Sequence, residues 1–202
     1  VTVLVFLIIY ILYNGIPNLT LPGLFDWEYN SQNVSMMPAI INTVIMTALS
    51  LLLAVPLGVF SAIYLVEYAR RGNKLVKVVR ITAETLSGIP SIVYGLFGYV
   101  LFVLTLDWGY TLLSGAITLA IMILPLIMRT TEEALLSVPD SFREGSFGLG
   151  AGRLRTVFKI VLPSAVPGIL AGVILAIGRI VGESAALIFT AGTNPVVPDS
   201  LF

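Results

Sequence analysis

NTVIMTALSLLLAVPLGVFSAIY, residues 42–64, is the stretch that decides the fold class of this chain. It contains no charged side chain, and the charge-free interval around it extends from Tyr29 to Val66. A helix needs about 20 predominantly apolar residues to cross a bilayer core of about 30 Å. The stretch therefore predicts one membrane-spanning helix.

Three further charge-free intervals have a similar length: residues 85–106, 108–128 and 160–178. The chain also opens with mostly apolar residues 1–13, which are too few to cross a bilayer. We therefore expect an all-α polytopic membrane protein with one truncated and four complete spans, forming a single transmembrane domain over residues 1–202. Because the first span is truncated and no Met precedes it, we expect a fragment, with six helices in the full chain.

The composition excludes several kinds of chemistry. Charged residues make up 11% of the chain, against roughly a quarter in soluble domains. The absence of Cys and His removes thiolate and imidazole metal sites and every imidazole-based triad. No P-loop motif is present, so we expect no enzymatic activity and no cofactor, with any ATP chemistry supplied by a partner. The zero net charge favours no nucleic-acid binding.

The basic residues indicate the orientation of the spans. Two segments carry ten of them, whereas segments 14–37 and 107–110 carry none. By the positive-inside rule the two basic segments face the cytoplasm, which places the Trp27 loop, the Asp107 turn and the tail after Thr190 outside. The ten residues are Arg70, Arg71, Lys74, Lys77, Arg80, Arg129, Arg143, Arg153, Arg155 and Lys159.

The second basic segment contains SFREGSFGLGAGRLRTVFKIVLP at residues 141–163. Ser141 and Glu144 have the spacing of a capping box and predict the start of a short amphipathic helix. Gly150 and Gly152 should end that helix. Its small residues expose backbone and favour close contact with another protein.

This segment resembles the cytoplasmic loop of the permease family of ATP-binding-cassette importers, whose pattern is EAA, three residues, Gly, nine residues, then I-x-L-P. The matching positions are Glu144, Gly145, Ser146, Gly150, Ile160, Leu162 and Pro163. The resemblance implies a coupling loop at about residues 130–163 whose helix docks on an ATP-hydrolysing subunit. The alternative is a solvated helix lying on the membrane interface, although such a helix prefers bulky apolar residues where this one has Gly and Ser.

Two opposite charges stand inside the last apolar stretch, SAVPGILAGVILAIGRIVGESAALIF at residues 164–189. Arg179 and Glu183 are expensive at membrane depth, and their spacing puts them on one helix face. The planar guanidinium of Arg179, with its several N–H donors, suits a tetrahedral oxyanion such as phosphate. Glu183 could accept a hydrogen bond from a protonated phosphate oxygen. The alternative is a salt bridge that only orders the helix bundle.

Four glycines in the same stretch indicate helix packing. Gly168 with Gly172, and Gly178 with Gly182, are four residues apart, which lets neighbouring helices approach closely.

The segments PLGVFSAIYLVEYA (56–69), LSGIPSIVYGLFG (86–98) and GRIVGESAALIFTAG (178–192) resemble PstA-type permeases of phosphate-specific transport systems. The resemblance implies the MetI-like transmembrane fold and import of phosphate across the bacterial cytoplasmic membrane, with Arg179 and Glu183 on the translocation route. The implied partners are a homologous second permease, ATP-hydrolysing cassette subunits, an extracytoplasmic phosphate-binding protein and the lipid bilayer.

Two other functions stay open at this stage. A secondary transporter or ion channel would use Arg179 and Glu183 as an ion relay, and broken helices in both halves of the chain would favour it. A membrane anchor without transport would explain the cytoplasmic loop but not the intramembrane charges.

Overall fold

The computed structural model describes residues 2–18, 25–27, 35–70 and 72–193, and all of their regular structure is helical. These residues fall into two compact units divided between Val44 and Ile45. The division lies within one helix, α3 (Met37–Ile63), and the prediction of a single transmembrane domain stays a prediction. The expected external tail after Thr190 lies mostly outside the described residues.

The first unit contains α1 (Thr2–Gly15), the short 3-10 turn η1 (Ile16–Asn18) and the start of α3. Helix α1 is mostly apolar and has 14 residues, fewer than a bilayer crossing needs. The Ser35 hydroxyl accepts a hydrogen bond from the Met37 amide at 3.2 Å, which caps the beginning of α3.

Among the described residues, three helices are long and apolar enough to cross a membrane. The first is α3 with its π-helical extension η2 (Tyr64–Tyr68), and the second is α6 (Leu112–Leu136). The third joins α8 (Arg153–Thr156), the π-helical segment η4 (Val157–Val161) and α9 (Leu162–Val181). The all-α, polytopic prediction is confirmed.

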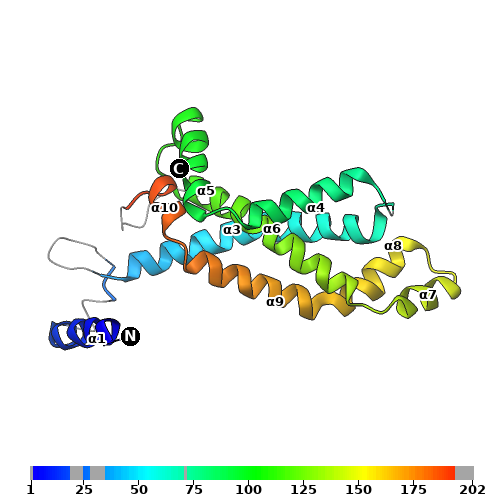
Figure 1. Ribbon diagram of the computed structural model, residues 1–202, viewed down its shortest axis with the longest axis horizontal. Coiled ribbons are helices and arrows are strands. Elements are labelled where there is room, and N and C mark those ends of the chain that lie inside the picture. The colour runs from blue at the N-terminus through cyan, green and yellow to red at the C-terminus, as the bar shows by residue number, and fades with distance from the viewer. Residues whose placement is uncertain (1, 19–24, 28–34, 71, 194–202) are drawn as a thin grey trace. The chain divides into compact units, whose positions relative to one another are not determined.

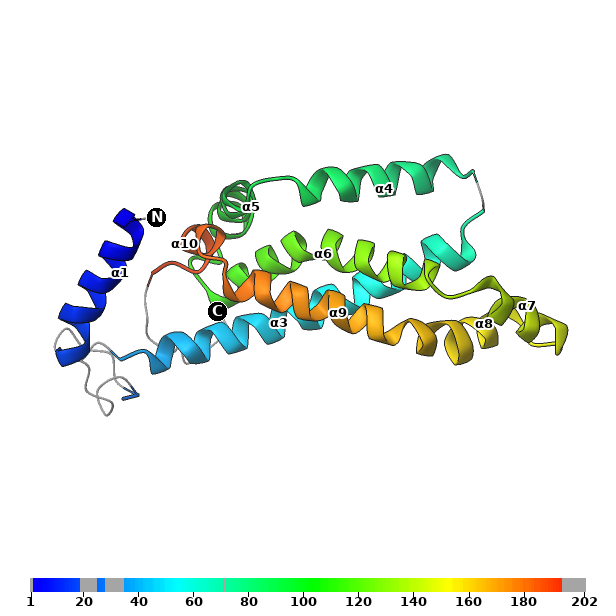
Figure 2. The same ribbon diagram turned by 60° about the horizontal axis from the view of Figure 1, so that its bottom comes forward.

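Helix α6 is the centre of the second unit. Its most apolar window is 67% buried, against 33% for that of α3–η2 and 22% for that of α8–α9. Figure 2 shows α6 between α4 (Lys74–Ser87) and α9, while the second part of α3 reaches α6 through a hydrogen bond of 2.9 Å from the Ser50 hydroxyl to the Ala116 carbonyl. A helix that is apolar on all sides belongs inside the bundle, whereas α3 and α9 leave apolar faces for lipid or protein.

The predicted third span, residues 85–106, is wrong as one continuous helix. Residues 85–87 close α4, and a new helix, α5 (Ser91–Gly98), begins after Pro90 and continues as the π-helical η3 (Tyr99–Thr105). The two helices are bent by 101° at the break. Figure 1 shows the change of direction between α4 and α5. Pro90 lacks an amide hydrogen and restricts the residue before it, so the α4 helix cannot continue through this point.

The predicted fifth span is continuous over residues 160–178, but the apolar stretch expected to extend it to residue 189 is interrupted. Helix α9 ends at Val181, and a separate short helix, α10 (Ala185–Thr190), follows. Both figures show α10 beside α5, and a Cβ added to Gly95 would lie 2.7 Å from Ala186 Cα. The two short helices therefore pack with their backbones in close approach.

The three π-helical segments each add a residue to a helical turn. In η2 the Ala69 amide donates to the Tyr64 carbonyl at 2.9 Å, and at the end of η3 the Leu106 amide donates to the Leu101 carbonyl at 3.0 Å. Both bonds span five residues instead of four. Such segments are frequent at functional sites, and here η4 lies inside the predicted coupling loop.

Candidate functional site

The predicted coupling helix is α7 (Asp140–Gly148). It begins one residue before Ser141, its N-cap is Pro139, and no side chain caps it. The predicted capping box of Ser141 and Glu144 is therefore wrong. The Pro139 carbonyl accepts from the Phe142 amide at 3.1 Å, so proline geometry starts this helix instead.

Gly150 ends α7 as the sequence predicts. Its φ angle is +80°, and its amide donates to the Phe147 carbonyl at 2.9 Å, while the Ala151 amide donates to the Ser146 carbonyl at 3.1 Å. This pair of bonds is a Schellman motif, which needs a residue in the left-handed region at the position of Gly150. The glycine of the family pattern is thus explained by backbone conformation.

The outer surface of α7 is open. Glu144 is exposed, and nothing lies within 4 Å of a Cβ built at Gly145. Three bulky apolar side chains around the helix are about half exposed or more: Phe142 at 50%, Phe147 at 48% and Leu149 at 91%. Ser146 instead points inward and shares a hydrogen bond of 2.8 Å with the Thr156 hydroxyl, which joins α7 to α8. The exposed apolar residues favour contact with another protein.

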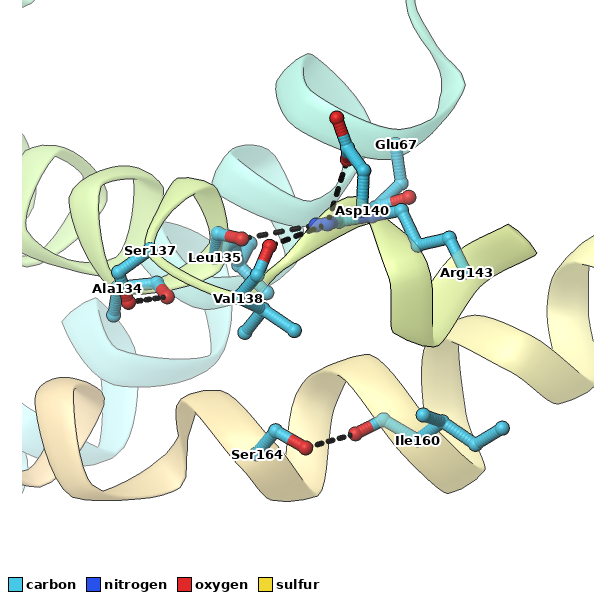
Figure 3. A network of polar contacts seen from close by, with 9 residues as sticks. All are labelled: Glu67, Ala134, Leu135, Ser137, Val138, Asp140, Arg143, Ile160 and Ser164. Carbon is cyan, nitrogen blue, oxygen red and sulfur yellow. Dashed lines mark hydrogen bonds and ion pairs between the residues drawn. The ribbon is translucent and has the colours of Figure 1, made fainter. Parts of the chain in front are cut away.

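Arg143 fixes α7 to the rest of the second unit. Its guanidinium donates to Glu67 Oε1 from Nη2 at 2.7 Å and from Nε at 3.1 Å, and it reaches the carbonyls of Val138 at 2.8 Å and Leu135 at 2.9 Å. A longer contact of 3.2 Å goes to Asp140. Figure 3 shows these contacts converging from the end of α6, from α7 and from η2.

This ion pair is buried: the Arg143 and Glu67 side chains are 15% and 8% exposed. Sequence reasoning counted Arg143 only as one of the ten cytoplasmic cations. The available signal was Glu67, a carboxylate placed directly at the end of an apolar span, where an unpaired charge would be costly.

The remaining positions of the loop pattern lie where η4 passes into α9. Ile160 and Leu162 are partly buried, whereas Pro163 is exposed and occupies the first turn of α9. The Ile160 carbonyl accepts from the Ser164 hydroxyl at 2.7 Å (Figure 3). Pro163 has no amide hydrogen to donate, and the π-helical turn before it changes the register of the backbone hydrogen bonds.

The four glycines predicted to pack helices divide into two pairs. A Cβ at Gly168 would lie 2.7 Å from Ala134 Cβ, and one at Gly172 would lie 2.8 Å from Thr130 Cβ, so both face α6 closely. A Cβ at Gly178 would meet nothing within 4 Å, and one at Gly182 only the Gly178 carbonyl at 3.4 Å. In the described part of the chain, no neighbouring helix packs against the second pair.

Arg179 and Glu183 do not share a helix face. Arg179 lies in the last turn of α9, and Glu183 follows the end of that helix. The Glu183 carboxylate accepts a hydrogen bond from the Ala186 amide at 3.1 Å and so caps α10. Within the described part of the chain no ion pair joins the two residues. Sequence reasoning missed Tyr94, a residue of α5 that lies at the other helix break.

Tyr94 belongs to the break between α4 and α5. Its hydroxyl donates to the Leu86 carbonyl at 2.9 Å, and the side chain is buried. The two helix breaks thus meet: α5 and α10 pack together, and the residues beside the breaks include Tyr94, Arg179 and Glu183. Only the three-dimensional arrangement shows this, because residues 94 and 179 are far apart in the chain.

Residues 54–199 match the family described as "Binding-protein-dependent transport system inner membrane component". The chain belongs to this family. The "Probable ABC transporter permease protein YqgI" of Bacillus subtilis is 39% identical over 201 residues, covering 96% of this chain and 66% of that protein. The "Phosphate transport system permease protein PstA 1" of Mycobacterium tuberculosis is 39% identical over 154 residues, covering 76% of this chain and 50% of that protein.

Solved structures support the same fold for this inner membrane component. The structure described as "Inward facing conformations of the MetNI methionine ABC transporter: CY5 SeMet soak crystal form" aligns with a TM-score of 0.59 at 23% identity, covering 73% of this chain and 68% of that chain. The likeness shows the predicted MetI-like fold. Secondary transporters also contain broken helices, but the family that this chain matches is one of binding-protein-dependent transport components.

This binding-protein-dependent transport component spans about half to two thirds of the length of the relatives named above. The match covers both predicted site regions, α7 with its loop and the Arg179 segment, because each lies between residues 54 and 199.

Proposed function

We propose that this chain is a permease subunit of an ATP-binding-cassette importer that moves inorganic phosphate across the bacterial cytoplasmic membrane. A separate ATP-hydrolysing subunit drives it through the coupling loop, and the permease itself has no catalytic role. Family membership supports the transport role, and the names of relatives such as the PstA 1 protein support phosphate as substrate.

The observation that carries the proposal is the way α7 is mounted. A short helix with exposed Phe142, Phe147 and Leu149 is clamped by the buried Arg143–Glu67 pair to η2 and to the end of α6. An exposed apolar helix that is rigidly attached suits the transmission of movement. A displacement of α7 by a bound partner would reach α6, the central helix, directly through the Arg143 contacts. A helix lying passively on the membrane interface would not need this buried attachment.

Arg179 is the proposed contact for the substrate. Because Glu183 caps α10, the Arg179 charge is not neutralised by a described carboxylate, and its fork of donors can pair with phosphate oxygens. Arginine stays ionised at any physiological pH, so the site keeps its attraction for the anion. Glu183 nearby lowers the local positive potential, which helps release of the ion.

The proposed partners are a homologous second permease, two ATP-hydrolysing subunits and an external phosphate-binding protein. The open surfaces at Gly178 and Gly182 are available to the second permease, since no side chain among the described residues lies within 4 Å of a Cβ built at either position.

The experiment compares two variants of the full-length protein, expressed with its partner subunits in cells that lack their own phosphate importers. Arg179→Gln should lower uptake of radiolabelled phosphate by about 10- to 100-fold, the loss expected for a charge-assisted hydrogen bond worth roughly 1.5–3 kcal/mol. Recovery of the ATPase subunit on purification should stay normal. Leu149→Asp should instead reduce that recovery, because it places a charge in the docking surface.

Arg155→Gln removes one exposed cation, whereas Arg179 is partly buried; it is the charge-matched control for Arg179→Gln and should leave uptake unchanged. Normal uptake in Arg179→Gln would contradict the proposed substrate contact. Phosphate transport by the purified permease in vesicles without any ATPase subunit would contradict the importer function as a whole.

A further inference from the structure

A cleft of about 770 Å³ lies beside the mounting of α7. Its walls come from η2, from the segment that leads into α4, from α4 itself, from the end of α6 and from α7 and Arg153. This volume lies within the range of small-ligand sites, roughly 300–1,000 Å³. The cleft shares Phe147 and the Arg143–Glu67 pair with the mounting of α7, but the proposed function gives no role to the basic residues between η2 and α4 that line it.

The cleft is positively charged. Six basic side chains line it against three acidic ones, and each acidic one already has a cation: Glu67 and Asp140 pair with Arg143, and Glu84 pairs with Arg129 at 3.7 Å. Of the remaining basic residues, Arg80 is held by Glu132 at 2.6 Å.

Four cations of the cleft are left without a carboxylate partner in the described residues. They are Arg70, Lys74, Lys77 and Arg153. Lys74 and Lys77 stand in the first turn of α4, which has no acidic residue to offset the positive end of the helix dipole. The cleft therefore has an excess of positive potential and favours an anion.

An apolar surface adjoins this charge. Helix α4 exposes Leu75 at 73%, Val78 at 58% and Ile81 at 53%, while Val76 and Ala83 on its other side are buried. A short helix that carries lysines beside exposed aliphatic side chains has the character of a helix at the membrane interface. An occupant that combines an anionic group with hydrocarbon would satisfy both surfaces at once.

We propose that the cleft binds the headgroup of an anionic phospholipid. Its phosphate contacts Lys74 and Lys77, and its acyl chains lie along Leu75 and Val78. Basic pockets between helices on the cytoplasmic side recognise such headgroups, and the positive-inside expectation places this cleft on that side. A free phosphate ion would match the charge but would leave the aliphatic surface of α4 uncovered.

The test is a titration of the full-length permease, purified with its partner subunits, with phosphatidylglycerol or phosphatidylcholine, in which native mass spectrometry counts bound lipids. The wild type should bind phosphatidylglycerol more tightly. Lys74→Gln/Lys77→Gln should weaken that binding by roughly 20- to 30-fold, as expected for two lysines near an anionic group, and leave phosphatidylcholine unchanged.

The matched control is Arg155→Gln/Lys159→Gln. It removes two exposed cations that are also expected on the cytoplasmic side but that lie outside the cleft. It should change phosphatidylglycerol binding by less than about twofold. Equal affinity of the wild type for the two lipids, or equal losses in the two double variants, would overturn the proposal. Displacement of phosphatidylglycerol by millimolar inorganic phosphate, with binding of that ion in the absence of lipid, would assign the cleft to the free ion and also overturn it.

Discussion

Arg143 is the residue on which the position of α7 depends. Its guanidinium pairs with one buried carboxylate and donates to two backbone carbonyls, so truncation leaves the Glu67 carboxylate without its cation and removes a donor from each carbonyl. Arg143→Ala should lower the free energy of unfolding by about 3–5 kcal/mol, the usual cost of breaking a buried ion pair. Denaturant titration of the purified permease in detergent, followed by circular dichroism, measures the change.

Arg153→Ala provides the comparison, because Arg153 is exposed and its described contact is a stack on the Tyr68 ring at 5.5 Å. Its loss should be below about 1 kcal/mol, as for an exposed cation over an aromatic ring. Similar stabilities for the two variants would show that the Arg143 network does not hold α7.

At the level of single residues, the sequence predicted correctly which residue ends α7 but not which residue begins it. Gly150 was expected to end α7, and it does so in the left-handed conformation that favours glycine. The capping box was wrong because Pro139 starts the helix first. The Arg143–Glu67 pair could not be predicted from the sequence, since the two residues are 76 positions apart and the residues around each give no indication of its partner.

Among the elements, the position and length of the apolar segments were easier to predict than whether each segment forms one unbroken helix. The hydrophobic run of residues 85–106 is real, but the chain bends within it where Pro90 removes a backbone donor. The last span was expected to continue through Glu183. It stops because the Glu183 carboxylate caps a new helix, an interaction that periodicity does not reveal.

Helices α5 and α10 pack too closely to accept a side chain between them. Gly95→Ala would place a Cβ 2.7 Å from the Ala186 backbone, so the two helices must separate. Overpacking of this kind should lower the free energy of unfolding by about 1–3 kcal/mol. The same denaturant titration provides the measurement.

Gly88→Ala is the matched change in the same bent pair, because its Cβ would meet only the Thr85 carbonyl at an ordinary 3.5 Å. It should leave stability within about 0.5 kcal/mol of the wild type. If Gly95→Ala were equally harmless, the close contact between α5 and α10 would be absent from the folded protein.

For the whole molecule, the orientation in the membrane is the prediction most open to direct measurement. The chain has no cysteine, so labelling of a single introduced thiol shows on which side of the membrane that residue lies. Tyr110→Cys, 57% exposed in the turn expected outside, should react with a membrane-impermeant maleimide in intact cells. Leu149→Cys, beside α7, should react only after the cells are permeabilised.

Labelling of both positions in intact cells would contradict the orientation derived from the basic segments. The reversed pattern would place α7 outside, where no ATP-hydrolysing partner could reach it, and would remove the basis of the proposed coupling.

The π-helical segments bear on how chains of this kind can vary in length. Each holds one residue more than an α-helical turn, so a lineage could lose that residue and return to ordinary i to i+4 pairing at the same place. A loss inside α6 would instead turn one half of the central helix by about 100° against its neighbours. Single-residue gaps between homologous chains should therefore gather at residues 64–68, 99–105 and 157–161 and spare the interior of α6.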